Sequence, residues 1–330
     1  MDKISIFWFR RDLRLHDNVA LFNALKSGEK VLPIFIFDTS ILDKLPKNDA
    51  RVSFIIKELR SMNEHLKSFD ASIDILHGKP IEVFESLIKK YQIASVFTNQ
   101  DYEPYAIRRD QEILELLKSE NINFNSFKDQ VIFEKNEITK KDGNPYVVYT
   151  PYSKKWIEAY ELINHTHYTS EDLLSQLYTN SKTKELTLEE LGFVETNTPI
   201  KNYIFNSRII NEYEETRNFP ALDNTSKLGP HLRFGTVSVR QMVSRAEEQE
   251  NKTFLKELIW REFFMQILWH FPHTHKDSFK PKYDRIIWRN NEDDFKRWCN
   301  GTTGYPMVDA GMRQLNNTGF MHNRVRMLVG

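Results

Sequence analysis

Ser5-Ile-Phe-Trp-Phe9 is a short uncharged run near the start of the chain, and Arg10-Arg-Asp-Leu-Arg-Leu-His-Asp-Asn18 follows it directly. A compact apolar run that ends in a polar turn is typical of a strand buried in a parallel sheet. We interpret the charged run as an Asp–Arg network that fixes the first crossover. The turn has no Gly-x-Gly-x-x-Gly pattern, so the sequence does not indicate dinucleotide binding there.

Further apolar runs alternate with helical patterns along the first third of the chain. The runs that suit buried strands are Val31–Phe37, Ser72–Leu76 and Ala94–Thr98, with Asn121–Phe127 or Val131–Phe133 as a last strand. The helical patterns between them are Val19–Lys26, Ala50–Phe69, Pro80–Tyr91 and Ile107–Glu120. This alternation predicts an α/β fold with a doubly wound parallel sheet.

Composition excludes several classes of protein. At 330 residues, with 40% hydrophobic and 28% charged residues, the chain is an ordinary globular protein that can bury two cores. The single cysteine, Cys299, excludes an internal disulfide, and no apolar run reaches membrane-spanning length. We expect a cytoplasmic protein with no membrane partner. His270, His273 and His275 are spaced poorly for one face, so we expect no metal.

The chain changes character twice along its length. We expect an α/β domain at residues 1–133, then an interdomain connection at residues 134–200 with at least one helix near Ser153–Leu162. Residues 201–330 have helical patterns. This last part has 20 Lys and Arg against 15 Asp and Glu, while the rest has 26 against 31. A basic half in a neutral chain allows binding to a phosphate backbone.

Glu257-Leu-Ile-Trp-Arg-Glu-Phe-Phe264 carries unusual chemistry for a helix. At helical spacing, Glu257, Trp260 and Arg261 place a carboxylate, an indole and a guanidinium side by side. A helix that only supports a core has Leu or Ile at such positions. Taken alone, the run is also compatible with an i,i+4 ion pair beside a half-buried aromatic residue.

Thr225-Ser-Lys-Leu-Gly229 stands at an expected helix start. Two hydroxyl groups, a lysine and a glycine beside free backbone N–H groups form a suitable cradle for a diphosphate. The simpler interpretation is that Thr225 or Ser226 caps the helix.

Two later runs give these features a common interpretation. They are Gly304-Tyr-Pro-Met-Val-Asp-Ala-Gly-Met-Arg313 and Thr318-Gly-Phe-Met-His-Asn-Arg-Val-Arg-Met327. Together with the stretches above, including the opening run, they resemble the DNA photolyase/cryptochrome family. The resemblance implies an N-terminal antenna domain, an all-helical FAD-binding domain, and DNA containing pyrimidine dimers as the partner.

The resemblance also implies roles for single residues. Trp260 resembles the indole that stacks on the lesion, Glu257 the carboxylate that hydrogen-bonds its bases, and Asn323 the amide that contacts both flavin and lesion. The FAD contacts implied are Tyr213, Thr225, Ser226, Lys227, Leu228, Gly229, Phe254, Glu257, Arg261 and Asn323. The DNA contacts implied are Arg217, Glu257, Trp260, Asn323, Arg324 and Met327.

Some positions depart from the family or discriminate within it. Gly229 replaces a serine, and Phe320 replaces a common tryptophan, for which we expect only a packing consequence. Members that repair (6-4) lesions have histidines at the positions of Asn323 and Met327, because that repair needs proton transfer. An amide and a thioether do not transfer protons at neutral pH. The sequence therefore predicts a class I photolyase for cyclobutane pyrimidine dimers, with a cryptochrome-type blue-light sensor or a non-catalytic nucleic-acid-binding fragment as alternatives.

Three further expectations follow from the resemblance. Trp288 resembles the outermost tryptophan of the photoreduction chain, and we expect it to be solvent-accessible; otherwise it is an exposed loop aromatic. A second, antenna chromophore is open: Tyr105-Ala106 replaces the Asn-Glu pair of folate-binding members, which leaves a deazaflavin, a flavin, a differently held folate or none. The family continues beyond Gly330, so we expect a C-terminally truncated monomer that is inactive by itself.

Overall fold

A five-stranded, all-parallel sheet forms the centre of the N-terminal half. The computed structural model describes residues 3–179 and 186–330. The strands lie in the order β3-β2-β1-β4-β5, which places β1 in the middle. Their bounds are Ile4–Phe9 (β1), Lys30–Asp38 (β2), Asp74–Gly78 (β3), Ile93–Asn99 (β4) and Asn123–Phe127 (β5).

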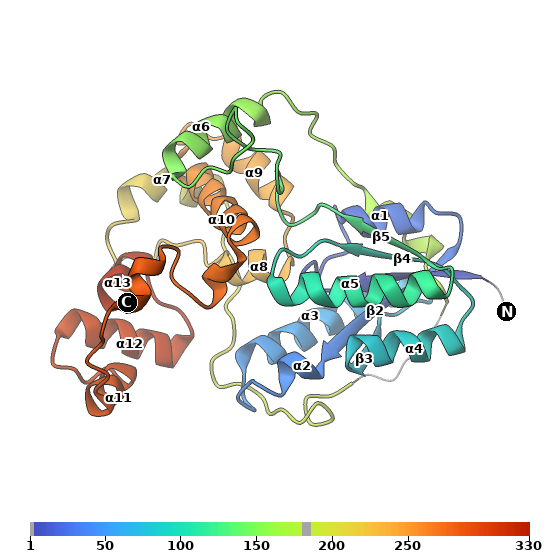
Figure 1. Cartoon of the computed structure of the whole chain (residues 1–330), viewed down its shortest axis with the longest axis horizontal. Coiled ribbons are helices and arrows are strands. Elements are labelled where there is room, and N and C mark those ends of the chain that lie inside the picture. The colour runs from blue at the N-terminus through green and yellow to red at the C-terminus, as the bar shows by residue number, and fades with distance from the viewer. Residues whose placement is uncertain (1–2, 180–185) are drawn as a thin grey trace.

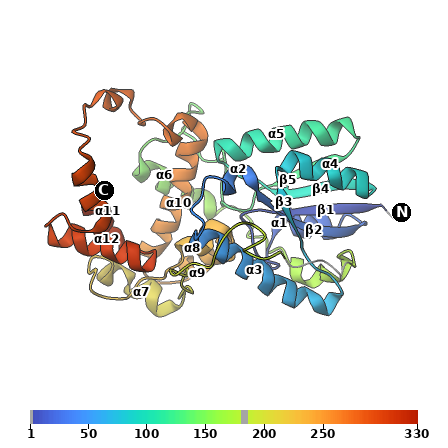
Figure 2. The same ribbon diagram turned by 90° about the horizontal axis from the view of Figure 1, so that it is seen from below.

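Helices cover both faces of this sheet, as Figures 1 and 2 show. Phe7 and Phe9 of β1 point into a core with α1 and α3, whereas Ile6 and Trp8 point into a core with α4 and α5. Alternate residues of one strand thus enter opposite cores, which confirms the predicted doubly wound sheet. The helices and turns of this half are α1 (Val19–Leu25), α2 (Thr39–Leu42), α3 (Ala50–Leu66), η1 (Lys67–Phe69), α4 (Pro80–Lys90) and α5 (Pro104–Ser119).

Strands and helices lie within a few residues of their predicted bounds, with one exception. Val131–Phe133 does not form a strand. The backbone N–H groups of Ile132 and Phe133 donate instead to the carboxylate of Glu262, at 2.6 and 3.0 Å. A side chain distant in sequence has replaced a neighbouring strand, and a local pattern cannot show that.

The connection between the two halves packs into both cores. Within it, α6 (Tyr149–Tyr160) buries Trp156 in the core of the helical half, and this helix confirms the one predicted near Ser153–Leu162. The 3-10 helix η2 (Ser170–Gln176) buries Leu174 beside α1 instead. The division of the chain at residues 133 and 200 stays a prediction.

The secondary structure of residues 201–330 consists of helices joined by loops, without strands, as predicted. In Figures 1 and 2, α10 lies between the sheet and the helices α11 to α13. These last helices form a small core of their own around Met312, Met321 and Val325. The elements are α7 (Ser207–Thr216), α8 (Gly229–Phe234), α9 (Val239–Glu247), α10 (Thr253–His270), η3 (Pro272–His275), η4 (Pro281–Arg285), α11 (Glu292–Asn300), α12 (Pro306–Thr318) and α13 (Asn323–Val329).

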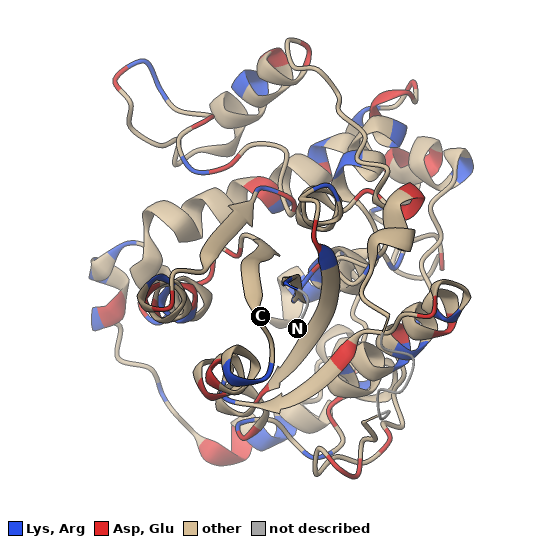
Figure 3. Cartoon of the chain, turned by 90° about the vertical axis from the view of Figure 1, so that its right-hand side faces the viewer, with Lys and Arg blue, Asp and Glu red and all other residues tan. Residues whose placement is uncertain are grey.

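Charge of both signs surrounds a nearly uncharged sheet. Figure 3 shows Lys and Arg beside Asp and Glu on the covering helices, whereas the strands carry few of either. None of the helices described is both long enough and apolar enough to cross a membrane.

Buried ion pairs join the sheet to the helical half. Asp129, just after β5, accepts hydrogen bonds from Arg14 at 2.7 Å and from Arg240 of α9 at 2.9 Å. Arg240 also pairs with Asp17 at 3.1 Å. Burial alone would raise the pKa of Asp129, but the two guanidinium groups outweigh it and lower the pKa to about 2. The predicted Asp–Arg network is present, and it extends into the second half of the chain.

We expect Asp129→Asn to lower the free energy of unfolding by about 3–5 kcal/mol, because Arg14 and Arg240 would stay buried without their carboxylate. Urea unfolding followed by circular dichroism measures the loss. A lowered carboxyl pKa stabilises the fold fully above the ordinary value of 3.8, and this contribution is lost as the pH falls through about 2. The variant should lack this acid-dependent loss.

Asp142→Asn is the matched control, because Asp142 lies on an exposed turn where it bonds Asn144. Its urea midpoint should equal that of the wild type. Wild-type stability of Asp129→Asn at pH 7 would show that the buried network does not hold the two halves together.

Candidate functional site

A cleft of about 290 Å³ lies where α7, the loop before α8, α10 and the start of α13 meet. It gathers most residues that the sequence predicted for flavin and DNA binding. Trp260 and Met327, however, are absent from its wall. The predicted residues that line it are Tyr213, Arg217, Thr225, Ser226, Lys227, Leu228, Gly229, Phe254, Glu257, Arg261, Asn323 and Arg324.

Thr225 presents an unpaired polar atom at this cleft. Its hydroxyl is buried and has no hydrogen-bond partner within the part of the chain that the structure describes. Leaving a buried hydroxyl unpaired costs about 1–3 kcal/mol, and a ligand oxygen that reached this group from the cleft would remove that cost. Its neighbour Ser226 accepts the N–H of Leu228 at 3.3 Å.

Neither hydroxyl residue caps the following helix, so the simpler interpretation of this run is wrong. α8 begins at Gly229 with Leu228 as its N-cap residue, and no side chain caps it. The cause lies in the backbone of Lys227, whose φ of +55° is in the left-handed region. The chain turns there, and the hydroxyl of Ser226 accepts the N–H of the N-cap residue Leu228 instead of an N–H within the helix.

The two departures from the family pattern have different consequences. A Cβ at Gly229 would meet no atom within 4 Å, so the backbone does not require glycine there. The ring of Phe320 carries the ammonium group of Lys227, 3.9 Å from its centre, while Asp223 holds the same ammonium at 2.7 Å. We expected Phe320 to have only a packing role. Its ring also contacts the ammonium group of Lys227.

Arg217 and Glu257 form an ion pair across the cleft. Nη1 of Arg217 lies 2.7 Å from Oε1 of Glu257, and both side chains are about one-third exposed or less. The i,i+4 pair between Glu257 and Arg261 that the sequence allowed does not form. Arg261 donates instead to the carbonyl of Gln130, at 2.8 Å.

Arg261 and Glu262 anchor α10 to the segment after β5. Burial lowers the pKa of Arg261 to about 10, which leaves the guanidinium charged at pH 7. Glu262 accepts two backbone N–H groups of that segment and the indole N–H of Trp156, at 2.6 Å. Sequence analysis missed Glu262, although a carboxylate within a largely apolar stretch was a visible signal.

Trp260 stands beside the cleft, one helical turn after Glu257. Tyr149 stacks on one face of its indole, with ring centres 3.7 Å apart and planes 6° apart. The exposed ring of Phe264 also lies nearly parallel to the indole, with ring centres 5.4 Å apart and planes 26° apart. The face under Tyr149 is closed to a base, so a stacked base must use the other face. The lesion contact of Trp260 stays a prediction.

The start of α13 brings Asn323 and Arg324 to the cleft together with a histidine that sequence analysis missed. His322 caps α13 by accepting the N–H of Arg324 on Nδ1, at 3.2 Å. Burial, and then the nearby Arg324 and Lys227, lower the pKa of His322. Met327 is exposed and lies outside the cleft, although it follows Asn323 by one helical turn.

Trp288 lies on the loop between η4 and α11. Its side chain is 68% exposed, which confirms the expected solvent access. Its part in electron transfer stays a prediction. No group of three His, Cys, Asp or Glu side chains within residues 3–179 and 186–330 is placed to hold a metal ion.

A second pocket, of about 210 Å³, opens at the carboxyl ends of β1, β2 and β4. Apolar side chains and several arginines line it, and the guanidinium of Arg109 lies 4.8 Å from the ring centre of Trp8. Tyr105 donates to Asp38 there; burial and this carboxylate raise the pKa of Tyr105 to about 12. The carboxyl edge of a parallel sheet is a usual place for a ligand.

Comparison with known proteins identifies the family of this chain. Residues 5–171 match the family model described as DNA photolyase, and residues 254–330 match the FAD binding domain of DNA photolyase. A deoxyribodipyrimidine photo-lyase of Synechococcus is 33% identical over 354 residues, and the match covers 98% of this chain and 72% of that relative. The chain belongs to the DNA photolyase family. The resemblance drawn from its motifs is confirmed.

Solved structures of the family share this fold. A class III photolyase from Agrobacterium tumefaciens gives a TM-score of 0.84 at 30% identity and covers 100% of this chain and 72% of its own. An archaeal photolyase from Sulfolobus tokodaii, described with two FAD molecules, gives 0.78 at 30% identity, with 100% and 74% covered. A Synechocystis cryptochrome gives 0.84 at 23% identity, with 99% and 74% covered, which is a likeness of fold alone.

FAD is the cofactor of the helical domain in this family, and the cleft residues fit it. The unpaired hydroxyl of Thr225 offers a donor for a phosphate oxygen. The rings of Tyr213 and Phe254, whose centres lie 5.2 Å apart, give the same cleft an aromatic wall. The assignment of each residue to FAD stays a prediction.

Thr225→Val tests the cradle because it removes the hydroxyl and nearly keeps the shape. We expect the affinity for FAD to fall about 10- to 100-fold, since a hydrogen bond to a charged group contributes about 1.5–3 kcal/mol. Without FAD, the variant should melt at or above the wild-type temperature, because an unpaired buried hydroxyl is gone. Quenching of flavin fluorescence and thermal unfolding give the two readouts.

Thr274→Val is the control, because the hydroxyl of Thr274 donates to the carbonyl of Phe271 and does not line the cleft. Its FAD affinity should match that of the wild type. If Thr225→Val also binds FAD as tightly as the wild type, Thr225 does not belong to the cradle.

Proposed function

We propose that the protein to which this chain belongs is a photolyase that splits cyclobutane pyrimidine dimers in DNA under blue light. The observation that carries the proposal is the single cleft that gathers the Thr225–Gly229 cradle with Glu257, Arg261 and Asn323. One end of that cleft suits a diphosphate, and the other presents a carboxylate and an amide to a base. The relatives named deoxyribodipyrimidine photo-lyase support the same reaction.

The residues of the cleft orient cofactor and lesion. When bound and reduced, FAD supplies the light-driven electron that splits the cyclobutane ring. Glu257 and Asn323 hydrogen-bond the paired pyrimidines, and Trp260 provides an aromatic surface for bases that have left the duplex stack. Arg217 and Arg324 lie at the same cleft and supply positive charge for the DNA phosphates.

His322 bears on the choice of lesion. It is the one histidine on the cleft wall as described, and its Nδ1 already accepts a backbone N–H. Its pKa is lowered mainly by burial, so the imidazole is neutral at pH 7 and is a poor proton donor. A cleft without a ready proton donor favours cyclobutane dimers over (6-4) lesions, whose repair needs proton transfer.

The pocket at the strand ends suits a second chromophore. Its apolar walls and convergent arginines fit a planar, negatively charged ring system, and Tyr105 offers a neutral hydroxyl. The archaeal relative described with two FAD molecules supports a flavin as one choice. An absorption spectrum of the pigment released from the purified protein distinguishes a flavin, a deazaflavin and a folate.

We expect Trp260→Ala to weaken binding to dimer-containing DNA by about 1–3 kcal/mol, the usual contribution of stacking one base on an aromatic ring. Binding to undamaged DNA should change little, because the indole meets only extruded bases. Glu257→Gln should bind dimer DNA but lower the repair yield per absorbed photon. Fluorescence anisotropy and recovery of pyrimidine absorbance measure the two effects.

Trp269→Phe is the control, because Trp269 lies on the same helix but packs against Tyr102, away from the cleft. It should leave dimer recognition intact. Bound flavin with no repair would select the cryptochrome-type sensor. Equal affinity of the wild type for damaged and undamaged DNA would reduce the chain to a general nucleic-acid binder and contradict the proposal.

We also expect Trp288→Phe to slow the photoreduction of oxidised FAD several-fold and to spare repair by enzyme that is already reduced. The exposed indole is placed to exchange an electron with a reductant in solution. Flash photolysis of the protein with dithiothreitol measures the rate, and Trp298→Phe on α11 is the comparison. An unchanged rate in Trp288→Phe would make this residue an exposed loop aromatic only.

A further inference from the structure

Tyr149 is the first residue of α6, and its ring lies flat on the indole of Trp260. The two ring centres are 3.7 Å apart and the planes differ by 6°. Aromatic pairs usually meet edge to face or with an offset, because the negative faces of two rings repel each other. A parallel contact this close is therefore imposed by the packing around the two rings.

The rest of α6 holds Tyr149 in this place. Tyr152 and Trp156 follow on the same face of α6 at helical spacing, and both donate to the carboxylate of Glu262 on α10, at 3.4 and 2.6 Å. Figures 1 and 2 show α6 beside α10. Because Glu262 fixes α6 against α10, Tyr149 reaches Trp260 from a helix that is itself anchored.

The hydroxyl of Tyr149 adds a second attachment, one turn earlier on α10. It donates to the carbonyl of Lys256 at 2.7 Å, next to Glu257. Burial, and then the carboxylate of Glu257, raises the pKa of Tyr149 to about 12, so the hydroxyl remains a donor at pH 7. One tyrosine thus contacts two successive turns of α10, the turns that carry Glu257 and Trp260.

Other rings touch Trp260, but none lies on it as closely. Phe263 meets the indole edge-on, with planes 80° apart, and the exposed ring of Phe264 lies 5.4 Å away. Ordering a side chain at the moment of binding opposes association. An indole that Tyr149 already holds flat does not incur that cost when a base stacks on its other face.

We propose that Tyr149 is a positioning residue that holds the Trp260 indole in the orientation in which an extruded pyrimidine stacks on it. Such a role requires that Trp260 meets the lesion, so it rests on the proposed function. Tyr149 does not line the cleft, and the indole lies between its ring and the base. It therefore acts on dimer binding through Trp260 alone.

Tyr149→Ala removes the ring under the indole. With FAD bound, we expect it to weaken binding to a duplex that contains one cyclobutane dimer about 3- to 10-fold, the range for ordering one side chain at an interface. Affinity for the undamaged duplex and for FAD should stay at the wild-type values. Tyr149→Phe keeps the ring and should restore most of the dimer affinity. Fluorescence anisotropy measures DNA binding, and quenching of flavin fluorescence measures FAD binding.

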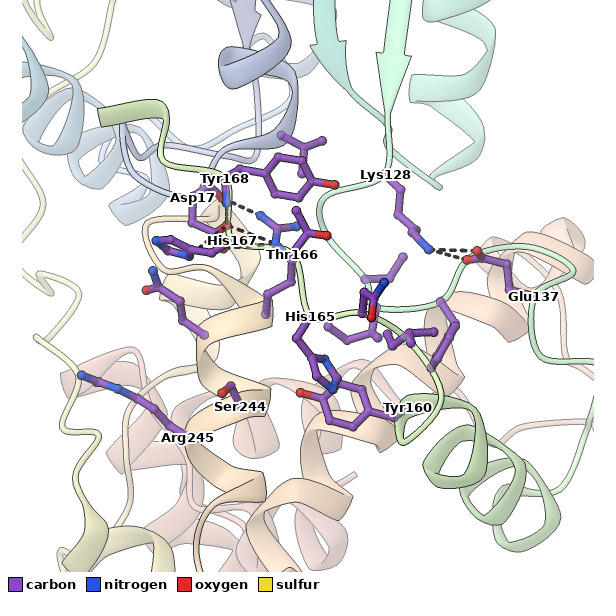
Figure 4. Close-up of a pocket in the computed structure, with 18 residues that line it drawn as sticks. Asp17, Lys128, Glu137, Tyr160, His165, Thr166, His167, Tyr168, Ser244 and Arg245 are labelled. Atoms are coloured by element: carbon purple, nitrogen blue, oxygen red, sulfur yellow. Dashed lines mark hydrogen bonds and ion pairs between the residues drawn. The ribbon is translucent and has the colours of Figure 1, made fainter. Parts of the chain in front are cut away.

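Tyr160→Ala is the matched control from the same helix. Tyr160 stacks on Trp156 at the other end of α6, with ring centres 5.0 Å apart and planes 12° apart, and it is the more deeply buried of the two tyrosines. Figure 4 shows it beside His165, at a cavity that shares no lining residue with the cleft. Tyr160→Ala should lower the melting temperature at least as much as Tyr149→Ala, yet bind dimer DNA like the wild type.

A double variant separates this role from the proposed function. In Trp260→Ala, the further change Tyr149→Ala should not alter dimer affinity, because the indole on which Tyr149 acts is gone. Unchanged or raised dimer affinity in Tyr149→Ala, an equal loss in Tyr160→Ala, or a further loss in the double variant would overturn the positioning role. Wild-type dimer affinity in Trp260→Ala would contradict the lesion contact itself, and this role with it.

Discussion

The geometry of both halves depends on one buried carboxylate. Glu262 lies on α10, yet its oxygens accept the N–H groups of Ile132 and Phe133 from the segment after β5 and the indole N–H of Trp156 from α6. Three parts of the chain thus meet at one side chain. Burial raises the pKa of Glu262 to about 7, and the converging donors oppose that rise because they favour the charged form.

The same face of α10 continues the attachment on either side of Glu262. Arg261 donates to the carbonyl of Gln130, and Gln266 donates to that of Phe133. Polar side chains of a helix thereby pair with an extended backbone in the way a neighbouring strand would. Glu257 and Arg261 lie four residues apart on this helix, and both line the cleft. The position of the cleft residues on α10 therefore depends on a backbone segment, residues 130–133, that does not line the cleft.

The sheet was predictable from sequence because strands buried on both faces read as short apolar runs, and this signal is local. Residues 131–133 gave the same signal, but the prediction of a strand there was wrong. Glu262, far along the chain, accepts the backbone hydrogen bonds of this segment. The cleft residues were predictable only through the family motifs. Spacing on α10 suggested a Glu257–Arg261 pair, but tertiary partners, the carbonyl of Gln130 and the guanidinium of Arg217, drew the two side chains apart. Sequence analysis missed His322, next to Asn323, because the role of a residue as a helix cap depends on where the helix begins.

For the proposed repair function, the ion pair between Arg217 and Glu257 has a consequence for discrimination between DNA molecules. With a distance of 2.7 Å, each group is satisfied by the other before any DNA arrives. A phosphate that draws Arg217 away leaves a partly buried carboxylate without its partner, which is unfavourable. In the proposed complex, only a pair of extruded bases brings donors that restore the balance at Glu257. Intact duplex DNA would break the Arg217–Glu257 pair without offering such donors to Glu257. The pair would therefore weaken binding to undamaged DNA, which is far more abundant than dimer-containing DNA.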